Sequence, residues 1–277
     1  MKNILVPVED HDLIGAVLAL ACRVARDFQG RIEGVALGPD MGDLIAADFA
    51  IAGSILDEKT RRSMVEGARR IFEDAMAREG IAAAAGGRDA AGHGWAGADM
   101  STDAAIGAYG RVFDVIVVGR PGSGRGDPRR ATLESALFDS GRPILIAPPR
   151  VGPTVGRTVA ISWNRATETA RTVAFAMPIF RRAERVTVLS VSGALAPGPS
   201  AQLLVRALQR HGIAADAVEV DSGAKNAGRV ILDRAAALGA DLLVKGGYTQ
   251  SRLRQLIFGG PTSEILQHAE IPVLMAH

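Results

Sequence analysis

Glycines, hydroxyl groups and basic side chains are concentrated between residues 246 and 265. Gly246 begins one glycine turn, and Gly259 and Gly260 form a second turn before Pro261, a residue type that favours the first position of a helix. Glycine lets backbone amides approach an anion closely, and a helix N-terminus carries a partial positive charge. The stretch is therefore predicted to bind a phosphate group. Side chains that could add hydrogen bonds are Ser251, Arg252, Arg254 and Thr262.

Three apolar runs in the first half of the chain have counterparts in the second half, which indicates an internal repeat. The simplest interpretation is two copies of one domain, residues 1–149 and 157–277, joined by a Pro/Gly-rich linker. The first copy is longer, and we place the additional residues in an insertion at about residues 38–57. The matching runs are residues 2–9 and 157–164, 114–119 and 241–246, and 142–147 and 271–276.

The apolar runs alternate with segments of helical periodicity, such as residues 227–238. The runs are continuously apolar, as in parallel strands that are buried on both faces. We therefore expect an α/β fold: two tandem three-layer α/β/α domains, each with a five-stranded, mainly parallel, Rossmann-like sheet. Ligands in such folds bind beyond the carboxyl ends of the strands. This rule indicates Glu9 and Asn164 after the first strands, and Gly119 and Gly246 after the fourth.

The composition excludes several classes of protein. The chain has 277 residues, and its single cysteine, Cys22, precludes a disulfide framework or a cysteine-rich zinc module. The 5 histidines lack ligand spacing, so we expect no metal site. With a net charge of +2 and no aromatic residues among the loop arginines, we expect no nucleic-acid binding. No apolar run approaches the roughly 18 residues of a membrane span, and no signal peptide is visible, so we expect a cytoplasmic protein.

The two-copy layout and the glycine-rich loop resemble the tandem members of the universal stress protein family. The resemblance implies an adenine nucleotide alpha hydrolase-like fold. Members that bind ATP carry a first-strand acid for the adenosine and a Gly-x2-Gly-x9-Gly-Ser/Thr loop for the phosphates. Here Gly246 and Gly259 match the first and third glycines, while Thr249 stands at the second and Gly260 at the Ser/Thr position. Asn164 replaces the acid and keeps a hydrogen-bonding side chain for the ribose.

The resemblance thus implies an adenine nucleotide site in the second domain. Asn164 has a second interpretation, as the N-cap of the following helix, and the two are compatible. The predicted nucleotide-binding residues are Asn164, Gly246, Thr249, Ser251, Arg252, Gly259, Gly260 and Thr262.

The first copy departs further from this pattern. Glu9 stands at the acid position, and the loop after Gly119 lacks the distal Gly–Ser/Thr pair, so we expect weaker nucleotide binding there, or none. Cys22 is interpreted as a core residue, and the apolar insertion either covers the first pocket or pairs with another subunit. The arginines of the first loop either bind another anion or are solvated: Arg120, Arg125, Arg129 and Arg130.

The leading hypothesis is a cytoplasmic, tandem universal stress protein that binds ATP or a similar nucleotide mainly in its second domain. It would act in the stress response as a sensor or as a module that binds a protein partner. No nucleophile–base pair is recognisable, so at most slow ATP hydrolysis is expected, and a role for Mg²⁺ is left open. The alternative is a nucleotide-free interaction protein with degenerate loops. In both cases the two domains form an intramolecular pseudo-dimer, with a homodimer as a further option.

Overall fold

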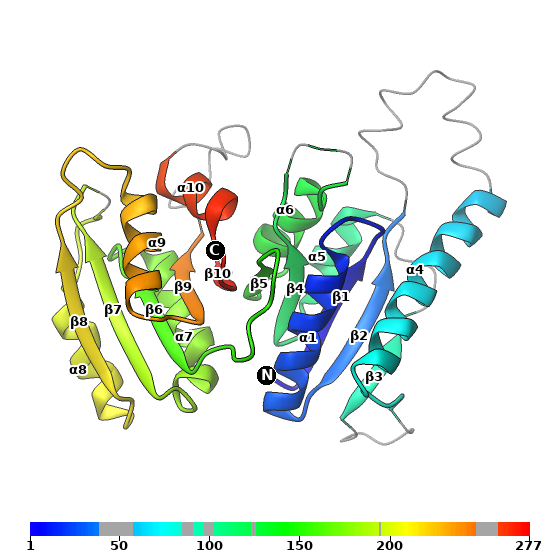
Figure 1. Ribbon diagram of the computed structural model, residues 1–277, viewed down its shortest axis with the longest axis horizontal. Coiled ribbons are helices and arrows are strands. Elements are labelled where there is room, and N and C mark those ends of the chain that lie inside the picture. Colours follow the sequence, from blue (N-terminus) through cyan, green and yellow to red (C-terminus); the bar gives the residue numbers. More distant parts are fainter. Residues whose placement is uncertain are drawn as a thin grey trace. The chain divides into compact units, whose positions relative to one another are not determined.

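The computed structural model describes residues 1–38, 58–84, 91–96, 102–122, 124, 126–193, 195–247 and 260–277. These residues form two compact units, each built around a sheet with helices on both faces (Figure 1). The first unit comprises Met1–Gly119 and Ser123–Arg142, and the second comprises Arg120–Gly122 and Pro143–His277.

The first unit has four parallel strands in the order β3-β2-β1-β4. The strands are buried because their apolar runs are continuous: in β1 every residue after the first is buried. The elements, in chain order, are β1 (Asn3–Val8), α1 (Ile14–Phe28), β2 (Arg31–Ala36), α4 (Glu58–Arg78), β3 (Gly92–Trp95), α5 (Asp103–Gly110), β4 (Val115–Gly119) and α6 (Arg130–Asp139).

The second unit has six strands in the order β5-β10-β9-β6-β7-β8, and all neighbours are parallel except β5 and β10. Helices α9 and α10 cover one face of this sheet, and α7 and α8 cover the other (Figure 1). The elements are β5 (Ile144–Ala147), β6 (Thr158–Ser162), α7 (Thr167–Phe180), β7 (Arg185–Val191), α8 (Ala201–Arg210), β8 (Ala215–Val220), α9 (Ala227–Ala237), β9 (Leu242–Gly246), α10 (Gly260–His268) and β10 (Val273–Ala276).

The predicted fold class is confirmed: both units are α/β/α layers around a mainly parallel sheet. In one detail the structure differs from the expectation, because β5 groups with the second unit and not with the first. It pairs antiparallel with β10, where Ile146 lies opposite Val273. This pairing satisfies the backbone of a fully buried four-residue strand. The repeat bounds 1–149 and 157–277 stay a prediction, and residues 39–57 of the predicted insertion lie outside the described residues.

The prediction that Cys22 is a core residue is confirmed. Its side chain is fully buried on α1, and its Sγ lies 3.8 Å from Met76 Sδ on α4. Burial raises the pKa of the Cys22 thiol to about 12. Among the described residues, none of the helices combines the length and apolarity needed to cross a membrane.

The raised pKa and the burial of Cys22 predict a thiol that does not react in the folded protein. At pH 8 a thiol reagent should modify the native chain at least about 100-fold more slowly than the chain unfolded in urea, which absorbance of the released chromophore measures. A Met64→Cys variant, which adds a thiol at an exposed position of α4, should react at once. Equal rates for the native and unfolded wild-type chains would contradict the burial of Cys22.

Candidate functional site

The carboxyl ends of β6 and β9 lie side by side in the second unit. The two strands are parallel neighbours, with Ser162 opposite Lys245. The chain passes from β6 to β7 and β8 on one side and then returns to β9 on the other side of β6, so the strand order reverses between β6 and β9. Ligands of doubly wound folds bind at this kind of position. Asn164 follows β6 here, and Gly246 ends β9.

Asn164 organises the start of α7. Its Oδ1 accepts a hydrogen bond from the backbone N–H of Ala166 at 3.2 Å and another from Thr169 Oγ1 at 2.5 Å. The first is an Asx-turn, which satisfies one of the amides left free before the helix. The N-cap residue of α7 is Ala166, whose side chain makes no capping hydrogen bond, so the interpretation of Asn164 as the N-cap is wrong: its oxygen closes the turn that precedes the helix. The side chain is half-buried.

Gly246 is buried at the end of β9 because α7 approaches it closely. A Cβ at this position would lie 2.5 Å from Thr169 N and 2.6 Å from Thr169 Oγ1. A larger residue would displace the helix start, so the glycine is required for packing. Since Thr169 also donates to Asn164, the two predicted residues Asn164 and Gly246 are connected through a single side chain.

The start of α10 agrees with the prediction from the glycine turn. The helix begins at Gly260, whose φ of +73° favours glycine, and Pro261 follows in the first turn. Thr262 lies in the same turn, and its Oγ1 accepts a hydrogen bond of 2.8 Å from Lys245 Nζ. Four of the predicted site residues, Thr249, Ser251, Arg252 and Gly259, lie outside the described residues.

Lys245 is a site residue that the sequence analysis missed. Its side chain is only 8% exposed, and its Nζ donates to Gly246 O at 2.9 Å as well as to Thr262. Burial alone lowers the pKa of Lys245 to about 8. The signal in the sequence was a lysine inside an otherwise apolar strand, directly before the first glycine of the loop.

The corresponding position in the first unit is occupied by an ion pair. Glu9, after β1, accepts a hydrogen bond of 3.1 Å from the backbone N–H of Arg129, the N-cap residue of α6, and its Oε2 lies 2.6 Å from Arg129 Nε. Arg129 also donates to Gly38 O at 2.8 Å and lies 3.9 Å from Asp103. The Glu9 and Arg129 side chains are only 10% and 14% exposed. A carboxylate of the chain itself therefore fills the anion position at the N-terminus of α6.

The expectation of a solvated basic loop is wrong for two of its arginines. Arg129 is buried in the ion pair with Glu9, and Arg120 donates to Ala269 O at 3.2 Å within the second unit. Arg130 pairs with Glu134 one turn along α6, at 2.5 Å, and Arg125 lies outside the described residues. Each of the described arginines of this loop thus pairs with an acceptor of the chain itself. Trp163 is buried, and its Nε1 donates to Pro199 O at 2.9 Å.

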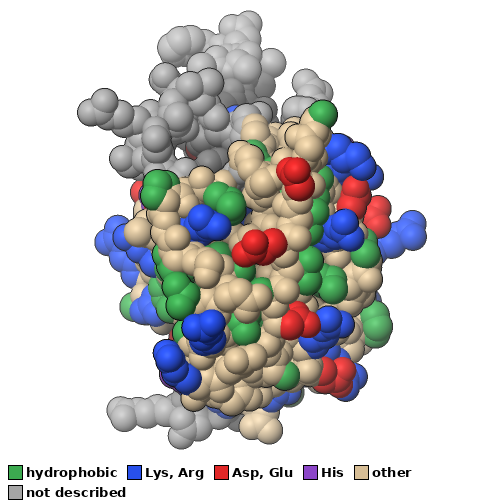
Figure 2. All heavy atoms as spheres, turned by 90° about the vertical axis from the view of Figure 1, so that its left-hand side faces the viewer, with side chains coloured by type: hydrophobic (Ala, Val, Ile, Leu, Met, Phe, Trp, Pro, Cys, Tyr) green, Lys and Arg blue, Asp and Glu red, His purple; other side chains and the backbone are tan. Residues whose placement is uncertain are grey.

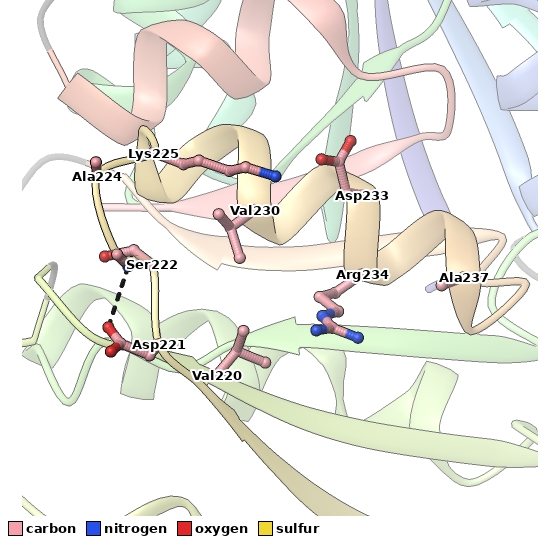
Figure 3. Close-up of a pocket in the computed structure, with 10 residues that line it drawn as sticks. Val220, Asp221, Ser222, Ala224, Lys225, Val230, Asp233, Arg234 and Ala237 are labelled. Carbon is pink, nitrogen blue, oxygen red and sulfur yellow. Dashed lines mark hydrogen bonds between the residues drawn. The ribbon is translucent and has the colours of Figure 1, made fainter.

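An open pocket of about 540 Å³ lies elsewhere in the second unit, between the end of β8 and α9. Figure 3 shows Val230 and Arg234 pointing from α9 toward Val220 of β8. None of the predicted nucleotide-binding residues lines it. The face of the second unit in Figure 2 shows Lys and Arg side chains interspersed with Asp and Glu, without a patch of one sign. The pocket lining has no excess of either sign, because it combines two cations with two acids: Lys225, Arg234, Asp221 and Asp233.

Comparisons with known proteins identify the relatives of the chain. Residues 166–277 match the sequence model of the universal stress protein family. The whole chain is similar to the solved structure of a universal stress protein from Archaeoglobus fulgidus DSM 4304, with 14% identity, coverage of 99% of this chain and 96% of that chain, and a TM-score of 0.72. A protein of unknown function from Pseudomonas aeruginosa PAO1 has 17% identity, with 100% and 92% of the two chains covered and a TM-score of 0.55. No curated protein matches the chain. The solved structures show a shared fold along both halves.

The buried charge of Lys245 predicts that its removal stabilises the protein without ligand. At pH 7 a Lys245→Met variant should gain about 2 kcal/mol in free energy of unfolding, because removing the buried charge outweighs the loss of its hydrogen bonds. Between the folded pKa of about 8 and the usual value of 10.5, the unfolded chain binds more protons, so this cost to wild type decreases as pH rises.

Urea unfolding at pH 7 and pH 10, followed by circular dichroism, checks this prediction. The difference between Lys245→Met and wild type should be largest at pH 7 and should shrink at pH 10. A Lys225→Met variant, at an exposed lysine of the same unit, should match wild type at both pH values. A Lys245→Met variant that is less stable than wild type at pH 7 would contradict the account of Lys245.

Proposed function

We propose that this chain, whose second half belongs to the universal stress protein family, binds an adenine nucleotide such as ATP in its second unit. The observation that carries the proposal is the convergence of candidate residues where the strand order reverses. Asn164 and Gly246 follow adjacent strands, and the hydroxyl of Thr262 lies within hydrogen-bonding distance of Lys245, the neighbour of Gly246. One ligand that spans a sugar and a phosphate could contact all of these positions.

The proposed roles follow from the chemistry of each group. The backbone amides of the Gly246 and Gly259–Gly260 turns would hold the phosphates, and the side chains of Thr249, Ser251 and Arg252 would add hydrogen bonds. Since Thr262 Oγ1 accepts from Lys245, its own hydrogen is directed to another acceptor, such as a phosphate oxygen. Asn164 would contact the ribose with its amide NH2 group, since its Oδ1 already accepts from Ala166 and Thr169.

The first unit supports a stoichiometry of one nucleotide per chain. Glu9 and Arg129 satisfy each other and are largely buried. Glu9 is bonded to Arg129 at the N-terminus of α6, so a phosphate there would have to displace the Glu9 carboxylate and break the buried ion pair. We therefore assign nucleotide binding to the second unit alone.

The proposed biological role is a cytoplasmic stress-response sensor or a module that presents a nucleotide-dependent surface to a protein partner. Chemistry on the nucleotide would be slow at most. The hydroxyl of Thr262 lies 2.8 Å from Lys245 Nζ, but Lys245, with a pKa of about 8, keeps its proton at neutral pH and is a poor base. A nucleotide-free interaction protein is the second candidate. The observation in its favour is that the oxygen of Asn164 is already engaged by Ala166 and Thr169.

Substitution of Asn164 by aspartate distinguishes these two functions. Asp keeps the oxygen that accepts from Ala166 and Thr169 and adds a negative charge for the ribose hydroxyls, so calorimetry should show ATP binding about 3- to 10-fold tighter in Asn164→Asp than in wild type. Asn226→Asp is the matched control, because Asn226 also accepts a hydrogen bond from the amide two residues further on, Gly228 N at 2.8 Å. Its affinity for ATP should equal that of wild type. Absence of binding at millimolar ATP in wild type and Asn164→Asp alike would favour the nucleotide-free candidate.

A pair of threonines tests which unit binds. Thr262 lies in the first turn of α10, and Thr132 lies in the first turn of α6, where its hydroxyl donates to Asp103 at 2.6 Å. Thr262→Val should weaken ATP binding about tenfold, the contribution of one hydrogen bond to a charged group, whereas Thr132→Val should leave the affinity within about twofold. Calorimetry should give one site per chain in wild type. Two sites, or a loss of binding in Thr132→Val, would place nucleotide in the first unit.

A further inference from the structure

Lys245 is a buried cation without an acidic partner among the described residues. Its exposed fraction is 8%, and its two hydrogen-bond partners, Gly246 O and Thr262 Oγ1, are neutral. The surrounding sequence supplies no acid either, because no Asp or Glu occurs from Leu242 to Ser263. Buried charges in proteins are normally paired with an opposite charge. The charge of Lys245 therefore lacks the compensation that a folded protein usually provides.

Lys245 lies beside the N-terminus of a helix, which adds to the uncompensated positive charge. Thr262, which Lys245 contacts, lies in the first turn of α10, where unpaired backbone amides create a partial positive charge. A helix N-terminus favours anions and disfavours cations. Two sources of positive charge thus meet at one point of the second unit, and two of the three ammonium hydrogens are used by neutral oxygens. Among the described residues, the third hydrogen has no acceptor and the charge has no acid, so both are open to a ligand.

In the first unit, the charges at the equivalent position are compensated within the chain. At the N-terminus of α6, the Glu9 carboxylate accepts from Arg129 N and pairs with Arg129 Nε. Anion and cation both come from the chain, and they compensate each other. In the second unit the position after the first strand carries Asn164, which has no charge. The comparison within one chain therefore indicates that the second unit takes its anion from solution.

We propose that Lys245 is a phosphate-binding residue whose ammonium group pairs with a phosphoryl group at the N-terminus of α10 and gives the site its preference for multiply charged phosphates. Phosphate fits this environment because its oxygens accept hydrogen bonds from an ammonium, a hydroxyl and backbone amides at the same time. The inference rests on the proposed function for the adenosine part of the ligand, but the phosphoryl part is tested separately.

The direct test compares ligands that share or lack the phosphates: ATP, adenosine and inorganic tripolyphosphate. Calorimetry of the full chain should show that Lys245→Met weakens the binding of ATP and of tripolyphosphate at least tenfold, while the affinity for adenosine changes less than twofold. Lys225→Met, which removes an exposed lysine, should bind all three ligands as wild type does. Unchanged affinity of Lys245→Met for ATP and tripolyphosphate would overturn the proposal.

Thermal unfolding gives a second measurement that does not depend on calorimetric heats. Saturating tripolyphosphate should raise the melting temperature of wild type and of Lys225→Met but not that of Lys245→Met. If wild type binds tripolyphosphate and not adenosine, the adenine assignment fails and the role of Lys245 stands. If wild type binds adenosine, but binds ATP no more tightly than adenosine and does not bind tripolyphosphate, the role of Lys245 fails and the nucleoside site stands.

Discussion

The positive charge of Lys245 at the start of α10 is the constraint on which this account depends. Strand β9 brings the ammonium there because its side chains alternate between the two faces of the sheet. Gly246 faces α7, where Thr169 leaves no room for a Cβ, and Lys245 contacts Thr262 of α10. A buried, uncompensated ammonium destabilises the free protein, and functional sites are the places where folds retain such conflicts. The same charge attracts an anion.

The two units show two outcomes of one topology. Both reverse their strand order beside the first strand, and both place a helix N-terminus after the fourth strand. In the first unit Glu9 and Arg129 close this position with opposite charges. In the second, the oxygen of Asn164 bonds to Ala166 and Thr169 at the start of α7, and the only cation that the structure describes at the start of α10 lacks an acid. Under the proposed function, the second unit would bind the ligand, while the first is closed by its own ion pair.

The sequence was sufficient for the fold because its strands are continuously apolar. The apolar runs at residues 157–164, 241–246 and 271–276 contain the strands β6, β9 and β10, and the glycine and proline at the start of α10 correctly indicated a helix start. The antiparallel pairing of β5 with β10 could not be predicted, because it depends on contacts distant in sequence. The Glu9–Arg129 pair was missed for the same reason. Lys245 was overlooked because the loop pattern drew attention to glycines, and burial is a property of the folded chain.

A crystal structure of the full chain with a non-hydrolysable ATP analogue tests the central claim most directly. The account predicts one analogue per chain, with a phosphate oxygen within about 3 Å of Lys245 Nζ and hydrogen bonds to Thr262 and the first amides of α10. It also predicts that the ion pair between Glu9 and Arg129 persists. Phosphates bound away from Lys245, whether beside Arg129 or in the pocket between β8 and α9, would contradict it.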